Sequence, residues 1–180
     1  MELIEGIKGR RSVRKFKDES VSHETLEKIV DAARFAPSWK NTQTARYLVL
    51  EDKALKDRIA DEAVLGFTHN KEIIDGAPAL VCITSVNKRS GYERDGSFST
   101  SKGNEWQMFD AGIAAEAFSL AAYEYGVGSV ILGVFDDEKV SEILGLEDTK
   151  TVSALIAIGI PEVIPDPTPR KDVAEYLSYK

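Results

Sequence analysis

The stretch that decides the fold runs from Glu105 to Tyr125 and reads EWQMFDAGIAAEAFSLAAYEY. Its apolar side chains recur at intervals of three and four residues, which is the period of an α-helix with a buried face. Gly126 and Gly128 follow and end the helix. Because the apolar positions cover much of the circumference, we expect this helix to be central or to lie in a subunit interface. These positions are Trp106, Phe109, Ile113, Ala114, Ala117, Phe118, Leu120, Ala121 and Ala122.

Shorter apolar segments lie on both sides of this helix. The sequence predicts strands at 47–50, 79–84, 129–134 and 152–160. It predicts further helices at 2–8, from the N-cap Ser22 to the break at Pro37, from about Lys53, and from Asp136 or Asp137 to Gly145. This order suggests a sheet between two layers of helices, although periodicity alone does not exclude a parallel sheet. With no internal repeat or linker, residues 1–180 are expected to form a single domain.

Composition narrows the class of function. The chain has 180 residues and a net charge of −7, which argues against affinity for nucleic acid or an anionic membrane. The single cysteine, Cys82, lies in an apolar run and is expected to be a buried small hydrophobe, so neither an intrachain disulfide nor a thiol-rich metal site is expected. His23 is expected to face solvent, and neither histidine has a partner at metal-ligand spacing. Without a secretory signal or a membrane-spanning run, a cytoplasmic location is expected.

Two polar segments flank the helix that starts at Ser22. Arg10-Arg11-Ser12-Val13-Arg14 offers guanidinium forks and a hydroxyl suited to a phosphate. Ala36-Pro37-Ser38-Trp39-Lys40-Asn41-Thr42-Gln43 offers amide and hydroxyl groups suited to the edge of a polar heteroaromatic ring. Taken singly, the first is equally a solvated basic stretch and the second a helix-to-turn transition. Together they suggest the two ends of a site for a phosphorylated ring cofactor.

The order of these two segments resembles the nitroreductase family of FMN-dependent oxidoreductases. The likeness covers nearly the whole chain and implies an α+β fold, a three-layer sandwich with a mainly antiparallel central sheet. It also implies that the C-terminal tail is exchanged with a partner subunit, whose sheet it extends. Further matching segments lie at 109–115, 126–133, 158–161 and 169–171.

The resemblance implies a homodimer with two FMN sites at the subunit interface. One subunit would supply Arg10 to the phosphate, together with Arg170, and Arg14 to the pyrimidine edge of the ring. The other subunit would cover the ring with Pro37 and its neighbours. No catalytic side chain is expected, because the flavin carries the chemistry, and no metal is expected. The implied cofactor-binding residues are Arg10, Arg11, Ser12, Arg14, Pro37, Ser38, Trp39, Asn41, Asn70, Leu132, Gly133 and Arg170.

The implied function is reduction of nitroaromatics, quinones or related small acceptors, with NADH or NADPH as electron donor and a ping-pong mechanism. Reductive dehalogenation, oxygen-dependent consumption of the flavin, and a non-catalytic flavin-binding dimer remain alternatives. Trp39 and Leu132 depart from relatives that carry small or acidic residues there, so acceptor preference does not carry over. The polar segment 85–104 is long for a connection and is expected to be either a functional lid or an ordering segment, and the sequence does not decide between them.

Overall fold

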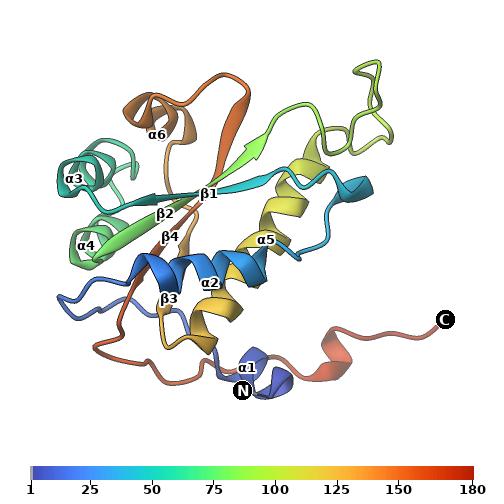
Figure 1. Ribbon diagram of the computed structural model, residues 1–180. Helices are drawn as coiled ribbons and strands as arrows, with labels where there is room; N and C mark the ends of the chain where they lie inside the picture. The colour runs from blue at the N-terminus through green and yellow to red at the C-terminus, as the bar shows by residue number, and fades with distance from the viewer. Residues whose placement is uncertain (1) are drawn as a thin grey trace.

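A computed structural model describes residues 2–180, and its centre is a four-stranded antiparallel sheet (Figure 1). The strands lie in the order β1-β2-β4-β3 and confirm the predicted antiparallel sheet. Both central strands are covered by helices on their two faces, so β2 is a continuous buried run. That double burial is why the apolar pattern did not distinguish a parallel from an antiparallel sheet. The strands are β1 (Ala45–Leu50), β2 (Ala79–Val86), β3 (Gly128–Leu132) and β4 (Lys150–Gly159).

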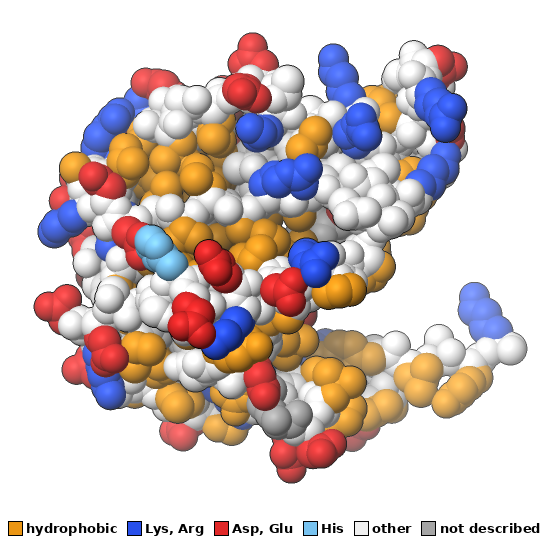
Figure 2. Space-filling view, viewed as in Figure 1, with side chains coloured by type: hydrophobic (Ala, Val, Ile, Leu, Met, Phe, Trp, Pro, Cys, Tyr) orange, Lys and Arg blue, Asp and Glu red, His pale blue; other side chains and the backbone are white. Residues whose placement is uncertain are grey.

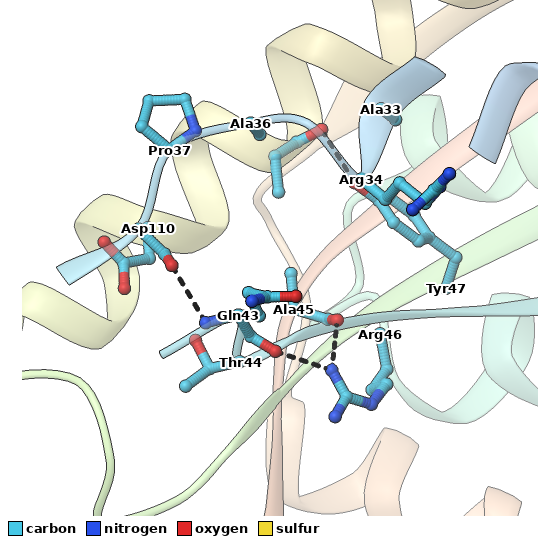
Figure 3. A pocket seen from close by; sticks show the side chains of 12 residues that line it. Ala33, Arg34, Ala36, Pro37, Gln43, Thr44, Ala45, Arg46, Tyr47 and Asp110 are labelled. Atoms are coloured by element: carbon cyan, nitrogen blue, oxygen red, sulfur yellow. Dashed lines mark hydrogen bonds between the residues drawn. The ribbon is translucent and has the colours of Figure 1, made fainter. Parts of the chain in front are cut away.

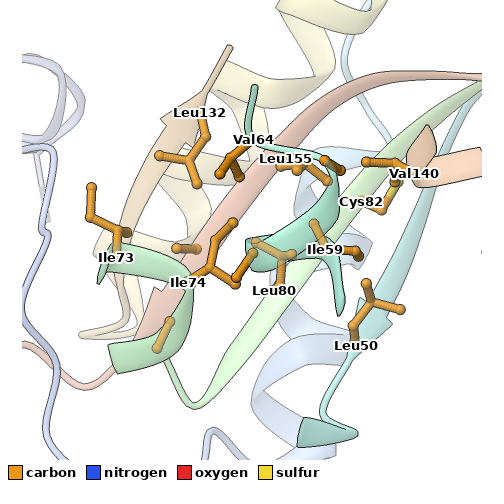
Figure 4. Close-up of a cluster of buried hydrophobic side chains, with 14 of the residues drawn as sticks. Leu50, Ile59, Val64, Ile73, Ile74, Leu80, Cys82, Leu132, Val140 and Leu155 are labelled. Atoms are coloured by element: carbon orange, nitrogen blue, oxygen red, sulfur yellow. The ribbon is translucent and has the colours of Figure 1, made fainter. Parts of the chain in front are cut away.

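Helices pack on both faces of the sheet. On one face lie α3 (Lys53–Glu62), α4 (Thr68–Gly76) and α6 (Asp137–Leu144), and on the other α2 (His23–Ala33) and α5 (Glu105–Glu124). Alternate residues of each strand point to opposite faces. The first layer buries Leu80, Cys82 and Leu155 of the sheet against helical side chains that include Ile59, Ile74 and Val140 (Figure 4). The second buries Val81, Ile83 and Ile156 against Ile29 and Phe118.

Three predicted helix ends are confirmed by the caps that form there, but the helix predicted to run from Ser22 to the break at Pro37 ends earlier, at Ala33. The Ser22 hydroxyl accepts a hydrogen bond from the backbone N–H of Thr25 at 3.2 Å. The Asp136 carboxylate accepts one from Lys139 at 2.9 Å, and Gly145 ends α6 with a φ of 59°. The third strand was predicted to reach Val134, but β3 ends at Leu132. Helix α4 was not predicted at all.

The two ends of the chain carry apolar residues that the rest of this subunit leaves uncovered. Helix α1 (Leu3–Gly9) exposes Leu3, Ile4 and Ile7. After β4 the tail extends away from the body of the subunit, with the short helix η2 (Val173–Glu175) within it (Figure 1). Figure 2 shows hydrophobic side chains along this tail. Within residues 2–180, no helix is long and apolar enough to cross a membrane.

Candidate functional site

The basic segment of the N-terminus lies along strand β3. Ser12 forms a parallel bridge with Ser129, and the backbone N–H of Val13 donates to the Ser129 carbonyl at 3.0 Å. This close approach depends on Gly128, where a Cβ atom would lie 2.9 Å from Val13 Cβ and from Pro161 Cγ. The main chain around Ser12 is therefore fixed to the sheet, and it carries the three arginines with it.

The side chains of Arg10, Arg11 and Arg14 use only some of their N–H donors within the described chain. Arg10 Nε lies 3.5 Å from Glu116 Oε1 of α5, and this buried nitrogen has no hydrogen-bond partner among residues 2–180. Arg11 donates from Nη1 to the carbonyls of Lys8 and Arg10. Arg14 donates to the carbonyl of Ser12 at 3.1 Å. Each guanidinium has five N–H donors, so all three keep donors for an anion.

Helix α4 brings Asn70 to the end of β3. Asn70 is buried and donates from Nδ2 to the Val134 carbonyl at 3.0 Å, which fixes the backbone that follows Leu132. Gly133 is exposed in this segment, with open space where a Cβ would point. Lys71, beside Asn70, is bound elsewhere: hydrogen bonds to Asp61 and Asp75 raise the pKa of its ammonium. A nearby hollow of about 260 Å³ has Arg14 and residues of α4 in its lining.

The second polar segment forms a tight turn, η1 (Trp39–Asn41), between α2 and β1. The Ser38 hydroxyl accepts the backbone N–H of Gln43 at 2.8 Å, which is the ordinary turn-forming role considered for this serine. Lys40, Asn41 and Gln43 have φ values of 44°, 55° and 49°, a left-handed conformation that is unfavourable for residues with a Cβ. The turn is therefore strained at Asn41, which is expected to cover the ring, and at Lys40 and Gln43 on either side of it.

An aromatic contact joins this turn to α5, and an ion pair joins it to the segment 85–104. The rings of Trp39 and Trp106 lie 4.5 Å apart, and the buried Nε1 of Trp39 has no hydrogen-bond partner in the described chain. Lys40 Nζ lies 2.7 Å from Glu93 Oε1 in the segment 85–104. That segment exposes basic side chains at the edge of the subunit (Figure 2). The segment 85–104 therefore lies beside the turn.

A cavity of about 320 Å³ lies behind the turn, between α2, β1 and α5 (Figure 3). Its lining includes the Asp110 carboxylate and Thr44, whose buried hydroxyl has no partner within residues 2–180. Sequence reasoning assigned neither residue to the site. Asp110 carried a usable signal, because it is a charged residue within the apolar pattern of the longest helix. Thr44 carried none.

Within one subunit, two groups of predicted site residues contact α5 at different places. Around Arg10, the first group lies at Glu116 and Tyr123, toward the C-terminal end of the helix. The second, around Trp39, lies at Trp106 and Asp110, near its N-terminal end. Arg170 is in neither group; it is exposed in the tail and bonds to Thr168.

Comparison with known proteins identifies the family. A family model described as the nitroreductase family matches residues 7–160, and the chain belongs to this family. It is 30% identical over 171 residues to an NADH dehydrogenase of Thermus thermophilus, an alignment that covers 84% of this chain and 83% of that protein.

Solved structures agree with the family assignment. A nitroreductase family protein from Clostridium novyi NT superposes with a TM-score of 0.78 and 31% identity, covering 90% of this chain and 88% of the other. A Desulfovibrio desulfuricans protein solved in complex with FMN superposes with a TM-score of 0.77 and 28% identity, covering 98% and 95%. The predicted α+β fold with its antiparallel sheet and the predicted family are thus confirmed, while the exchange of the C-terminal tail stays a prediction.

Proposed function

We propose that this protein is a homodimeric FMN-dependent oxidoreductase that uses NADH or NADPH to reduce nitroaromatics, quinones or related small acceptors. The observation that carries the proposal is the buried Arg10 Nε, on a basic segment fixed to β3: it has no hydrogen-bond partner within residues 2–180, although Glu116 lies 3.5 Å away as a counter-charge. A buried donor without a partner is costly, and an anionic group at this place would satisfy it. Membership of the family and the FMN-bound relative support FMN as that group.

The residues present fit a flavin mononucleotide. Arg10 and Ser12 would bind the phosphate, with Arg11 beside them and Arg170 arriving with the tail, and Arg14 would face the pyrimidine edge of the ring. A fixed guanidinium there favours negative charge on the ring in a site of low dielectric. Leu132 and Gly133 would lie against the ring, where the open space at Gly133 permits close approach of a planar group. Asn70 would hold that backbone in place.

The other face of the ring would be covered by Pro37, Ser38, Trp39 and Asn41 of the second subunit. Trp39 Nε1 is a second buried donor without a partner in the described residues, and a carbonyl or ring nitrogen would satisfy it. Because the Trp39 ring would border the acceptor side, the pocket would favour flat apolar acceptors, whereas the Leu132 side chain is buried in the core and only its backbone would face the ring.

When bound, FMN supplies the hydride chemistry, and the protein supplies placement and electrostatics. Neither the single cysteine nor His23 is placed to act as a competing nucleophile. Cys82 is fully buried, and burial raises the pKa of its thiol to about 12, so it stays protonated. His23 is exposed, as predicted, and bonds to Glu51 Oε2 at 2.9 Å on the surface. We therefore assign no catalytic side chain, and propose that donor and acceptor use one pocket in turn.

A dimer would cover the apolar surface that one subunit leaves open. One face of α5 packs on the sheet through Ala111, Ala115 and Phe118. The opposite face borders an open groove lined almost entirely by apolar side chains, with Phe109 and Ile113 among them. This face explains the broad apolar pattern of the helix: one side serves the core and the other, we propose, the partner.

An anaerobic experiment tests the function. The purified protein, loaded with FMN, is mixed with NADH or NADPH under nitrogen, and the flavin absorbance is followed. The proposal predicts that the yellow colour is bleached and that a quinone or nitroaromatic then restores it. If the protein stays yellow with both donors, the proposed activity is wrong, and the non-catalytic flavin-binding dimer is the alternative that remains.

A further inference from the structure

Asp110 is a buried carboxylate for which the proposed function has no role. It lies on α5 and is only 3% exposed. The backbone N–H of Trp39 lies 3.0 Å from both of its carboxylate oxygens. This bond joins residues 71 positions apart, so it connects the cofactor turn directly to the central helix.

The turn that Asp110 holds does not keep its place by its own bonds. Its internal hydrogen bonds run from Asn41 to Ser38, from Thr42 to Trp39 and from Gln43 to the Ser38 hydroxyl. These bonds shape the turn but attach it to nothing outside. The positive φ values at Lys40, Asn41 and Gln43 mean that this shape is strained and needs support from its surroundings.

Support from packing is missing on the inner side of the turn. The cavity of about 320 Å³ lies there, with Asp110, Ser38 and Gln43 among its lining residues (Figure 3). Three further attachments are the contact of Trp39 with Trp106, the ion pair of Lys40 with Glu93, and the hydrogen bond that Arg46 Nη1 of β1 donates to the Gln43 carbonyl at 2.8 Å. The ion pair is about half exposed and contributes little, and the Arg46 bond is exposed as well. The bond to Asp110 is buried and charge-assisted, and is therefore the strongest of the four.

We propose that Asp110 is a positioning residue, which anchors the strained turn 38–43 and so sets how that turn covers the cofactor ring. The anchoring hydrogen bond between Trp39 and Asp110 belongs to the chain itself, whereas its effect on FMN rests on the proposed function. Asp110 acts through Trp39 and need not touch the cofactor.

Two substitutions and a matched control test this role. Asp110→Ala removes the acceptor, whereas Asp110→Asn keeps a carbonyl oxygen for the Trp39 N–H. Ser119→Ala is the control, because Ser119 is also buried on α5 but its hydroxyl bonds within the helix, to the Ala115 carbonyl. We expect Asp110→Ala to weaken FMN binding roughly tenfold or more and to alter the visible circular dichroism of the bound flavin. Asp110→Asn should restore both to within about threefold of wild type, and Ser119→Ala should change neither.

Hydrogen exchange of the Trp39 amide in the flavin-free protein tests the anchor without any cofactor. We expect this amide to be protected in wild type and Asp110→Asn, and to exchange faster in Asp110→Ala. An unprotected Trp39 amide in wild type would overturn the proposal, even if Asp110→Ala does not fold. So would FMN affinity in folded Asp110→Ala equal to that of wild type. If wild type binds no FMN, the proposed function fails, while the exchange result still decides the anchor.

Discussion

Arg10 is the residue on which the phosphate assignment depends, because its Nε is buried without a hydrogen bond and Glu116 is its nearby counter-charge. We predict that Arg10→Ala weakens FMN binding tenfold to a hundredfold, the loss of a charge-assisted bond of about 1.5–3 kcal/mol. Titration of flavin-free protein measures this. Arg58→Ala is the matched control, since Arg58 is exposed on α3 and paired with Glu62. Equal FMN affinity in Arg10→Ala and wild type would show that Arg10 does not bind the phosphate.

Cys82 tests whether the flavin alone carries the chemistry. The thiol is buried among Leu80, Leu155 and Val140, where a hydroxyl would have to be desolvated. We predict that Cys82→Ser lowers the free energy of unfolding by about 1–3 kcal/mol and leaves the rate of flavin reduction by NAD(P)H nearly unchanged. Denaturant melts and stopped-flow absorbance check the two parts. Loss of reduction in a folded, yellow variant would mean that the thiol takes part.

The same thiol predicts a dependence of stability on pH. Its pKa rises from 9.0, the ordinary value, to about 12 in the folded protein because of burial. The unfolded chain therefore loses this proton first, so the contribution of Cys82 is complete below pH 9 and decreases as the pH rises toward 12. We expect wild type to lose up to about 1.4 kcal/mol per pH unit more than Cys82→Ala in that range. Parallel melts with equal slopes would contradict this.

At the scale of elements, the contact between β3 and the N-terminal segment places the arginines. Gly128 makes the contact possible, because a Cβ there would lie 2.9 Å from Val13 and Pro161. We predict that Gly128→Ala lowers stability by about 1–3 kcal/mol and also weakens FMN binding, since the basic segment must move. Gly76→Ala is the control: a Cβ at that α4 residue meets nothing within 4 Å. If Gly128→Ala were as neutral as Gly76→Ala, the segment would not depend on this approach.

The element order was largely predictable because caps and periodic burial are local signals. Ser22, Asp136 and Gly145 mark helix ends through bonds and angles that their own side chains or backbones determine. Helix α4 was missed because its N-cap, Phe67, makes no side-chain cap bond and so leaves no start signal in the sequence. The strand direction was not predictable, since two-sided burial removes the alternation that identifies an antiparallel sheet.

Only those parts of the site that lie in sequence motifs were predictable. The two polar segments indicated a phosphate end and a ring end, but their relative placement depends on long-range packing. Asp110 was missed because its partner, Trp39, is 71 residues away and the bond uses the backbone, which has no sequence signature. None of the three residues of the turn with a left-handed backbone is a glycine, so the sequence did not indicate this conformation.

For the whole molecule, the uncovered apolar surface indicates how two subunits would meet. Leu3 and Ile4 of α1, Phe109 of α5 and Tyr176 of the tail are all exposed, although a chain of this size has a core in which to bury such residues. We predict that removal of residues 162–180 weakens both dimerisation and flavin retention. Light scattering with absorbance of the same eluted peak measures both. A truncated protein that stays dimeric and fully loaded would show that the tail serves neither.

The central claim is that each flavin site takes its phosphate end from one subunit and its ring cover from the other. The direct measurement is activity of mixed dimers, made by co-expressing Arg10→Ala and Trp39→Ala chains with different affinity tags. It is assayed at an FMN concentration that saturates wild type but neither variant. In the mixed dimer one site carries both changes and the other carries none, so we predict up to about half of wild-type activity, well above either variant alone. Mixed dimers no more active than the two variant homodimers would contradict a site shared between subunits.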